Sequence, residues 1–275
     1  MKIKFRNISG REKLKHLKNL ESNGYAIIKD FIPKEVIKKY LDLTKKTFYK
    51  QKNNSNTPKV WNTAKIIYNL QSKDLRFLKI FNSIFFEKIL INKINDPHFR
   101  NLSKNKPNYI LNNLIARSSG DGKLFLHIDS GIPTGDVTTF VQIMIPLEPS
   151  NLNTGCTVVV PKSHKSKKFT DRRSKNLKKI EGEPGDVFIW DGNLWHGSLP
   201  NKTKETRWSL IATFSNWQFK QVFDIPRSID QKIYKQLKNK EKILLGYLSI
   251  PSNSEFKRVT RSISVKQLER NVASY

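Results

Sequence analysis

The sequence predicts a mainly β protein with helices, in which a double-sheet antiparallel barrel of the jelly-roll type is flanked by N-terminal and C-terminal helices. Between residues 109 and 217, short β-branched and aromatic runs alternate with Gly, Pro, Asn and Asp, the pattern of many short strands. On either side, apolar residues recur at helical spacing. The chain has 275 residues and 37% hydrophobic content, enough for one sizeable core, so we expect a single domain over residues 1–275.

The N-terminal part, residues 1–108, is predicted to be mainly helical. Residues 24–30, GYAIIKD, are typical of a short strand, and residues 31–49 follow as a helix with Pro33 in its first turn. A further helix is indicated over residues 75–89 by apolar residues on one face, which we interpret as core contacts. They are Leu75, Leu78, Phe81, Phe85 and Ile89.

The expected barrel core, residues 109–217, contains runs of β-branched and aromatic residues bounded by turn residues. Strands are expected within residues 109–118, 123–128, 137–147, 156–161, 186–192, 194–198 and 207–217. Residues 225–275 are predicted to be a basic, helical C-terminal part. Its apolar residues at helical spacing are Ile229, Ile233, Leu237 and Leu244.

The net charge of +28 is the most unusual bulk property of the chain. Basic residues are spread along it and are densest at residues 162–179, KSHKSKKFTDRRSKNLKK. Such a field attracts anions: an anionic small-molecule substrate, nucleic acid or an anionic membrane surface. The alternative is a lysine-rich composition that places Lys on every solvated face. The charge does not form one stripe, and no nucleic-acid-binding motif accompanies it.

The sequence contains no segment typical of export or of a membrane span. The N-terminal residues are charged throughout, which argues against a signal peptide, and no run approaches about 18 apolar residues. Cys156 is the one cysteine, so no internal disulfide forms, as in a reducing compartment. We therefore expect a soluble, cytoplasmic protein, with peripheral contact at the inner membrane face as a further option.

The segment 124–131, LFLHIDSG, contains the first candidate site residues. Side chains alternate faces along a strand, so His127 and Asp129 project to the same side. They supply two ligands for a metal ion, or they are a structural pair, since H-x-D alone is a common pattern. A third ligand would complete the set of two histidines and one carboxylate that leaves positions of an iron ion open.

The other histidines are the candidates for that third ligand, and we select His196. It lies on a later strand of the β-rich region, after the turn pair Asp191-Gly192. His16 belongs to a lysine-rich amphipathic segment and is expected at the surface, His98 precedes the β region, and His164 begins the basic stretch as a turn or capping partner.

Arg207 adds a cation to a run that otherwise has the composition of a core strand. An unpaired guanidinium in a protein interior costs several kcal/mol, so Arg207 is expected to bind an anion. Its planar fork suits a carboxylate. The alternative is an ion pair with Glu205 or Asp191.

Together these residues resemble the phytanoyl-CoA dioxygenase (PhyH) family of Fe(II)/2-oxoglutarate-dependent oxygenases. The resemblance covers about residues 20–217 and depends on the order of the motifs. They are NGYAIIKDFIPKEVIKKYLDL, His127-Ile128-Asp129, GCTVVVPKSHK, GDVFIWDGNLWHGSLPN and Arg207. The resemblance implies a double-stranded β-helix, the cupin-like jelly roll, with helices outside.

The resemblance also implies the roles of the candidate residues. His127, Asp129 and His196 would hold Fe(II), 2-oxoglutarate would chelate that iron, and Arg207 would bind the distal carboxylate of 2-oxoglutarate. The corresponding positions of the motifs imply further contacts to this carboxylate. They are the hydroxyls of Thr157 and Ser198, and a polar contact from Asn113. Strand geometry alone offers Ser209, which shares the face of Arg207, as an alternative donor.

Two details of the motifs bear on the chemistry. The family's proline-glycine-serine-histidine loop is Pro161-Lys162-Ser163-His164 here, so a lysine replaces the glycine and the backbone geometry of the loop is in question. Halogenating relatives lack the carboxylate ligand, whereas Asp129 is present, which favours hydroxylation or another oxidation.

The implied activity is a dioxygenase that uses Fe(II), 2-oxoglutarate and O2 to hydroxylate an unactivated C–H of a small substrate, with release of succinate and CO2. The basic stretch follows the strand that contains Thr157 and favours an anionic substrate. Trp190 and Trp195 are either pocket walls or core residues. The alternatives are a basic β-barrel that binds polyanions or a membrane surface without oxygenase activity, and a metal-binding barrel that uses no 2-oxoglutarate.

Overall fold

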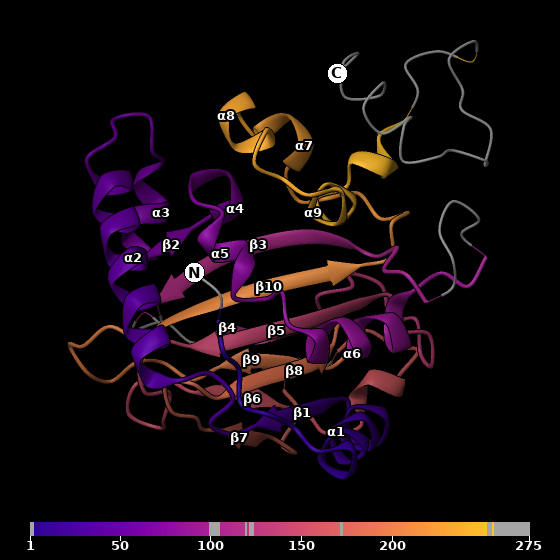
Figure 1. Ribbon diagram of the computed structural model, residues 1–275. Helices are drawn as coiled ribbons and strands as arrows, with labels where there is room; N and C mark the ends of the chain where they lie inside the picture. The colour runs from indigo at the N-terminus through magenta and orange to yellow at the C-terminus, as the bar shows by residue number, and fades with distance from the viewer. Residues whose placement is uncertain are drawn as a thin grey trace.

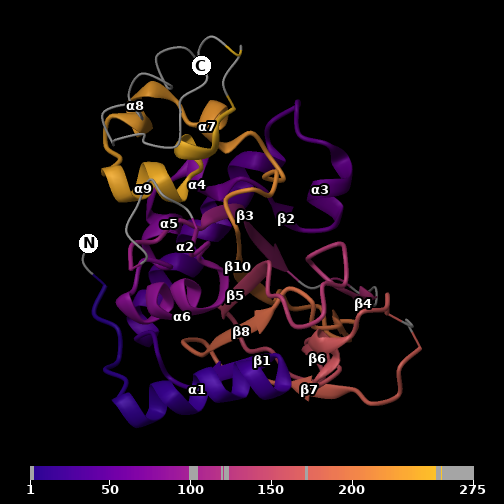
Figure 2. The ribbon, with the colours of Figure 1, turned by 90° about the vertical axis from the view of Figure 1, so that its right-hand side faces the viewer.

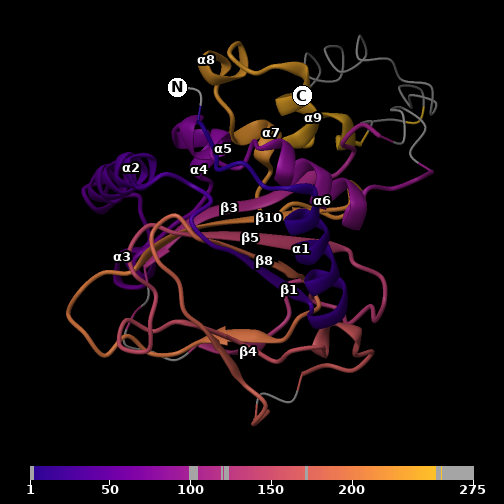
Figure 3. The same ribbon diagram turned by 60° about the horizontal axis from the view of Figure 1, so that its bottom comes forward.

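The protein is built in three layers (Figure 1). The computed structural model describes residues 3–98, 105–118, 120, 124–170, 173–251 and 255. Helices cover one face of a six-stranded sheet, and a four-stranded sheet lies opposite its other face (Figure 2). Figure 3, in which the bottom of the molecule comes forward, shows the smaller sheet separated from the larger one.

Both sheets are antiparallel, as a jelly roll requires. In order across it, the larger sheet contains β1 (Tyr25–Ile28), β8 (Val187–Asp191), β5 (Phe140–Pro146), β10 (Trp208–Ser215), β3 (Ile110–Ser118) and β2 (Ile66–Ile67). The smaller contains β4 (Leu124–His127), β9 (His196–Ser198), β6 (Thr157–Val159) and β7 (Lys178–Ile180). Consecutive strands such as β8 and β9 belong to different sheets, and this crossing confirms the predicted double-stranded β-helix.

Each segment predicted as a strand contains one. The sequence pattern missed β2 and β7, since β2 has only two residues and β7 lies at the end of the basic stretch. The helical layer consists of α1 (Gly10–Asn23), α2 (Lys34–Lys52), α3 (Lys59–Thr63), α4 (Leu70–Lys73), α5 (Arg76–Lys79) and α6 (Ile84–Ile94). After β6 comes the 3-10 turn η1 (Ser163–Lys165), and the chain then continues past β10 into α7 (Ile225–Ser228), α8 (Gln231–Tyr234), α9 (Asn239–Leu244) and η2 (Tyr247–Ser249). Within the described part of the chain, every helix is too short or too polar to cross a membrane.

Three predicted helices differ from the observed ones. Residues 75–89 form two helices, because the hydroxyl of Ser83 accepts the backbone N–H of Phe86 and begins α6 there. The helix expected from residue 31 begins at Lys34, with Pro33 as its N-cap. The C-terminal helix is interrupted, since Asp230 caps a new helix, α8. Its predicted continuation past residue 255 lies outside the described residues.

The larger sheet has one apolar face and one face that mixes apolar and polar side chains. On β10, Trp208, Leu210, Ala212 and Phe214 are buried in the core shared with the helices. The alternate positions of the same strand face the smaller sheet, as a period of two requires. The main core therefore lies between the helices and the larger sheet, whereas the space between the two sheets holds a smaller apolar cluster, which includes Met144 and Phe188, and the polar side chains of a cavity.

The prediction that His16 lies at the surface is wrong. Only 7% of His16 is exposed, and its ring packs edge-on against Phe85 at 6.3 Å between centroids. His16 and Leu20 form the buried face of α1, one helical turn apart. Burial lowers the pKa of His16, and the carboxylate of Glu12, 3.5 Å from Nε2, opposes this only in part.

In the smaller sheet, β4 approaches β9 closely at Gly197. A Cβ atom added to Gly197 would lie 2.4 Å from the carbonyl oxygen of Leu124. This contact is too short for any other residue, so the glycine permits the pairing. The register then places His127 directly opposite His196.

Burial of His16 predicts that stability falls in mild acid. The unfolded chain binds a proton below about pH 6.5, whereas the folded state keeps this imidazole neutral to lower pH. Folding therefore loses free energy as pH falls through about 6.5. We expect His16→Met to reduce this loss, measured as the difference in urea-unfolding free energy between neutral and mildly acidic buffer. An equal loss in both proteins would contradict the assignment.

The close approach at Gly197 predicts that Gly197→Ala lowers the free energy of unfolding by about 1–3 kcal/mol, the usual cost of overpacking. Urea unfolding measures it. Gly10→Ala is the matched control, because a Cβ at Gly10 meets no atom within 4 Å and alanine favours helix. Equal stability of the two variants would show that β4 and β9 separate without cost.

Candidate metal centre and the cavity beside it

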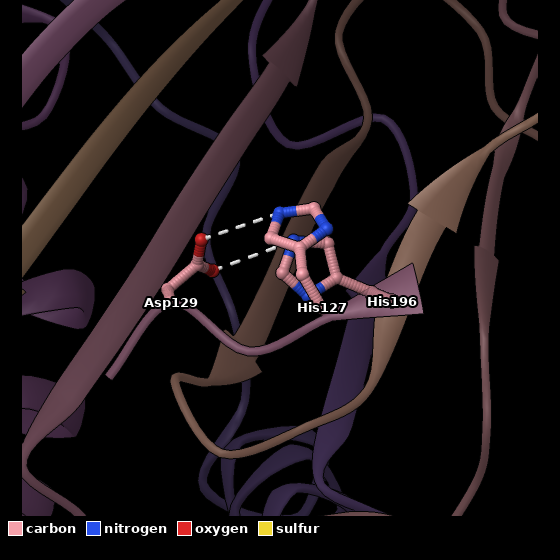
Figure 4. A group of neighbouring side chains, drawn as sticks. All are labelled: His127, Asp129 and His196. Carbon is pink, nitrogen blue, oxygen red and sulfur yellow. Dashed lines mark ion pairs between the residues drawn. The ribbon is translucent and has the colours of Figure 1, made fainter. Parts of the chain in front are cut away.

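The candidate ligands come from the ends of two paired strands (Figure 4). His127 is the last residue of β4 and His196 is the first of β9. Asp129 follows β4 in a turn, where its backbone N–H donates to the carbonyl of Gly192 at 2.8 Å. The connection between the two sheets thus fixes the position of the carboxylate relative to both rings.

The three side chains converge on one point. One ligand atom from each of His127, Asp129 and His196 lies within 4.8 Å of the others. Asp129 Oδ1 is 3.8 Å from His127 Nε2, and Asp129 Oδ2 is 3.4 Å from His196 Nε2. Atoms of these types at these separations can share one divalent cation.

The hydrogen bonds of the two rings suit metal binding. His127 Nδ1 lies 3.0 Å from the carbonyl oxygen of Phe125, and His196 Nδ1 lies 3.0 Å from that of Leu194. A carbonyl only accepts, so each Nδ1 carries the proton and each Nε2 presents its lone pair toward Asp129. Burial lowers the pKa of His196, which also favours the neutral, ligating form.

Trp190, from β8, supports the carboxylate. Its indole Nε1–H donates to Asp129 Oδ2 at 3.1 Å, and its ring lies 5.1 Å from that of His196. No local pattern predicts this bond, because the two residues meet only across the gap between the sheets. Trp195, by contrast, packs with the small apolar cluster of Leu126 and Val158 and belongs to the core.

A cavity of about 190 Å³ lies beside the three ligands, between the two sheets. It brings together all the residues that the sequence analysis selected: His127, Asp129, His196, Arg207, Thr157, Ser198 and Asn113. Ser209 is on the same face of β10 but more deeply buried, with 2% exposed, and its hydroxyl has no partner within the described residues. Trp190, which the sequence analysis considered as a pocket wall or a core residue, lines the cavity, and so do Arg117 and Gln142, which it did not select.

Arg207 is a buried cation without a counter-ion. Only 7% of it is exposed, Nη1 donates to the hydroxyl of Ser150 at 3.2 Å, and Nε has no partner in the described part of the chain. The anticipated alternative does not occur there, since Arg207 makes no ion pair with Glu205 or Asp191. Burial lowers the pKa of Arg207 to about 10, so the guanidinium still carries its charge at neutral pH.

The remaining histidines lie elsewhere. His98 is exposed. His164 is buried in η1, and its Nε2 lies 3.0 Å from the carbonyl oxygen of Glu21 in the last turn of α1, the capping role expected for it. Lys162, which precedes this turn, has φ of 68°, the left-handed conformation that favours glycine. The loop therefore keeps the backbone shape that a glycine would adopt more easily.

Comparisons with known proteins agree with this geometry. Residues 20–209 match the family model described as phytanoyl-CoA dioxygenase (PhyH). An uncharacterised protein of Mycobacterium tuberculosis is 29% identical over 111 residues, which are 40% of this chain and 41% of that protein. The chain thus matches less than half the length of this curated relative.

Solved structures share the fold at low identity. HygX from Streptomyces hygroscopicus, solved with nickel and 2-oxoglutarate bound, superposes with a TM-score of 0.61 at 13% identity, over 78% of this chain and 90% of that chain. The epimerase SnoN, in complex with Fe3+, alpha ketoglutarate and nogalamycin RO, has a TM-score of 0.58 at 12% identity, over 76% of this chain and 86% of that chain. Since the family model matches well over half of the residues, the chain belongs to the phytanoyl-CoA dioxygenase (PhyH) family, within the Fe(II)/2-oxoglutarate-dependent oxygenases.

Proposed function

We propose that this protein is a dioxygenase that hydroxylates a C–H bond of a small anionic substrate, with Fe(II) held by His127, Asp129 and His196. In this proposal Arg207 binds the distal carboxylate of 2-oxoglutarate. One observation carries it: the two imidazole lone pairs and the carboxylate that converge on one point share a cavity with an uncompensated guanidinium.

The ligand set fits a ferrous ion. Two neutral imidazoles and one carboxylate on one side of the ion leave the opposite positions open to other ligands. An iron ion held by these residues with 2-oxoglutarate would supply the activation of O2, with conversion of the co-substrate to succinate and CO2. The bound metal and ligand in HygX and SnoN support this reading of the site.

The polar atoms around Arg207 fit a carboxylate. Its Nε is buried and unpaired, and a carboxylate would restore the lost hydrogen bond and charge. Thr157, Ser198 and Asn113 line the same cavity and are proposed to add donors. Ser209, whose hydroxyl has no partner among the described residues, is proposed as an alternative donor.

The chain itself positions the substrate and excludes water. Apolar side chains of Leu124, Ile115, Ile211 and Met144 form part of the cavity wall. A C–H bond held there would face the metal ligands away from bulk water. The presence of Asp129 as a ligand supports hydroxylation rather than halogenation.

Charge supports an anionic substrate. The net charge is +28, and the basic stretch begins directly after β6, the strand that contains Thr157, and returns through the exposed Lys178 and Lys179 of β7. Such a field raises the local concentration of anions. A barrel that only binds polyanions or a membrane surface would use the same charge, but it leaves the converged ligands and buried Arg207 without a role.

Anaerobic titration tests the proposal. Fe(II) followed by 2-oxoglutarate should produce the weak visible charge-transfer band of the iron chelate in the wild-type protein. We expect His196→Ala to abolish the band, because a ligand is lost. His98→Ala should leave the band unchanged, because His98 is exposed and does not line the cavity. Absence of the band in the wild-type protein would overturn the proposed function.

The same titration places the co-substrate. Arg207→Gln should bind Fe(II) normally and require about 10–100-fold more 2-oxoglutarate, the equivalent of a lost charge-assisted hydrogen bond. Arg207→Lys should fall between the two, because it keeps the charge and loses the fork. Unchanged affinity for 2-oxoglutarate in Arg207→Gln would exclude Arg207 from the co-substrate site.

The bond from Trp190 to Asp129 predicts a role in metal affinity. Trp190→Phe keeps an aromatic ring beside His196 but removes the N–H, and we expect Fe(II) to bind about 10-fold more weakly. Anaerobic Fe(II) titration with unchanged thermal stability would check it. Trp195→Phe is the matched control, because the Trp195 Nε1 has no partner in the described structure. Equal affinities would contradict the role of Trp190.

A further inference from the structure

A second guanidinium, that of Arg117, lines the candidate site. On β3 the side chains of Asn113, Ile115 and Arg117 face the cavity, and the residues between them, Leu114 and Ala116, are buried in the core on the other side. Arg117 is therefore held on β3, which pairs with a strand on each side, by the same alternation that positions Asn113. It is not a loose surface residue that reaches in by chance.

Arg117 has no partner in the described structure. Its side chain makes no hydrogen bond or ion pair with a described residue. Its neighbours across the sheet are Ser209 of β10 and Ile66 of β2, neither of which is acidic. Burial is the main cause of the lowered pKa of Arg207, and the positive charge of Arg117 lowers this pKa further. The two cations are therefore close enough to repel each other. Two like charges in one cavity repel each other, and a bound anion would reduce this repulsion.

The cavity would keep a net positive charge even with Fe(II) and 2-oxoglutarate bound as proposed. Its charged lining, among the described residues, is Arg117, Asp129 and Arg207, with one excess positive charge. A ferrous ion and the 2-oxoglutarate dianion cancel each other, so loading both leaves the excess in place. Arg207 is the more buried of the two arginines and is assigned to the co-substrate, which leaves Arg117, partly exposed, for a ligand that arrives from solvent.

We propose that Arg117 binds the anionic group of the primary substrate, a carboxylate or a phosphate. This inference rests on the proposed function. Its planar fork pairs with either oxyanion through two parallel hydrogen bonds. Because Arg117 lies on a rigid strand, it would hold the anionic end of the substrate in place, and the C–H region would then face the metal ligands. Arg117 is then the residue that selects acids over their neutral analogues.

The experiment uses full-length protein loaded anaerobically with Fe(II) and 2-oxoglutarate, to which acetate or methyl phosphate is added in a calorimeter at constant ionic strength. One or both should bind to the wild-type protein, and Arg117→Gln should weaken that binding about 10-fold or more. Whichever probe binds more tightly identifies the class of anion. Arg117→Lys should recover part of the affinity. Arg11→Gln, the same substitution at an exposed position of α1, should have no effect.

Each other result decides against the inference. If the wild-type protein binds neither probe, or Arg117→Gln binds them as well as the wild-type protein, Arg117 does not hold an anion. If Arg117→Gln loses 2-oxoglutarate affinity as Arg207→Gln does, Arg117 belongs to the co-substrate site instead. A normal iron chelate in these cases leaves the proposed function standing, whereas a wild-type protein without the chelate overturns both.

Discussion

The pairing of β4 with β9 is the constraint on which the site depends. Gly197 lets the two strands approach until His127 stands opposite His196, and the carbonyl of Gly192 holds the turn that carries Asp129. All three ligands are therefore placed by backbone contacts. The indole of Trp190 adds a side-chain hydrogen bond to the carboxylate.

The larger sheet separates stability from function. Its outer face is covered by helices and contributes the apolar burial that stabilises the fold. Its inner face can then hold groups that are costly to bury, such as Arg207 with an unpaired Nε. An anion that paired with these groups, as we propose for 2-oxoglutarate at Arg207, would recover that cost.

Patterns with a period of two were enough to predict most strands. The sequence analysis expected His127 and Asp129 to share one side of a strand, but β4 ends at His127, and Asp129 reaches the same point from the turn that follows. Local helical signals were less reliable. The apolar face of residues 75–89 continues through the break before α6, because a cap at Ser83 ends one helix and starts another without changing the hydrophobic pattern. His16 was predicted at the surface because its neighbours are lysines, yet the face of α1 that it shares with Leu20 is the buried one.

By itself, the sequence determined where most strands lie along the chain, the alternation of their faces and the identity of the candidate ligands, since these follow from residue types and from short-range geometry. Only the tertiary structure decided which faces meet. The bond from Trp190 to Asp129, and the shared cavity of Arg117 and Arg207, join strands far apart in the chain. Such contacts depend on sheet order and register, which are set by the packing of the whole molecule and not by any local pattern.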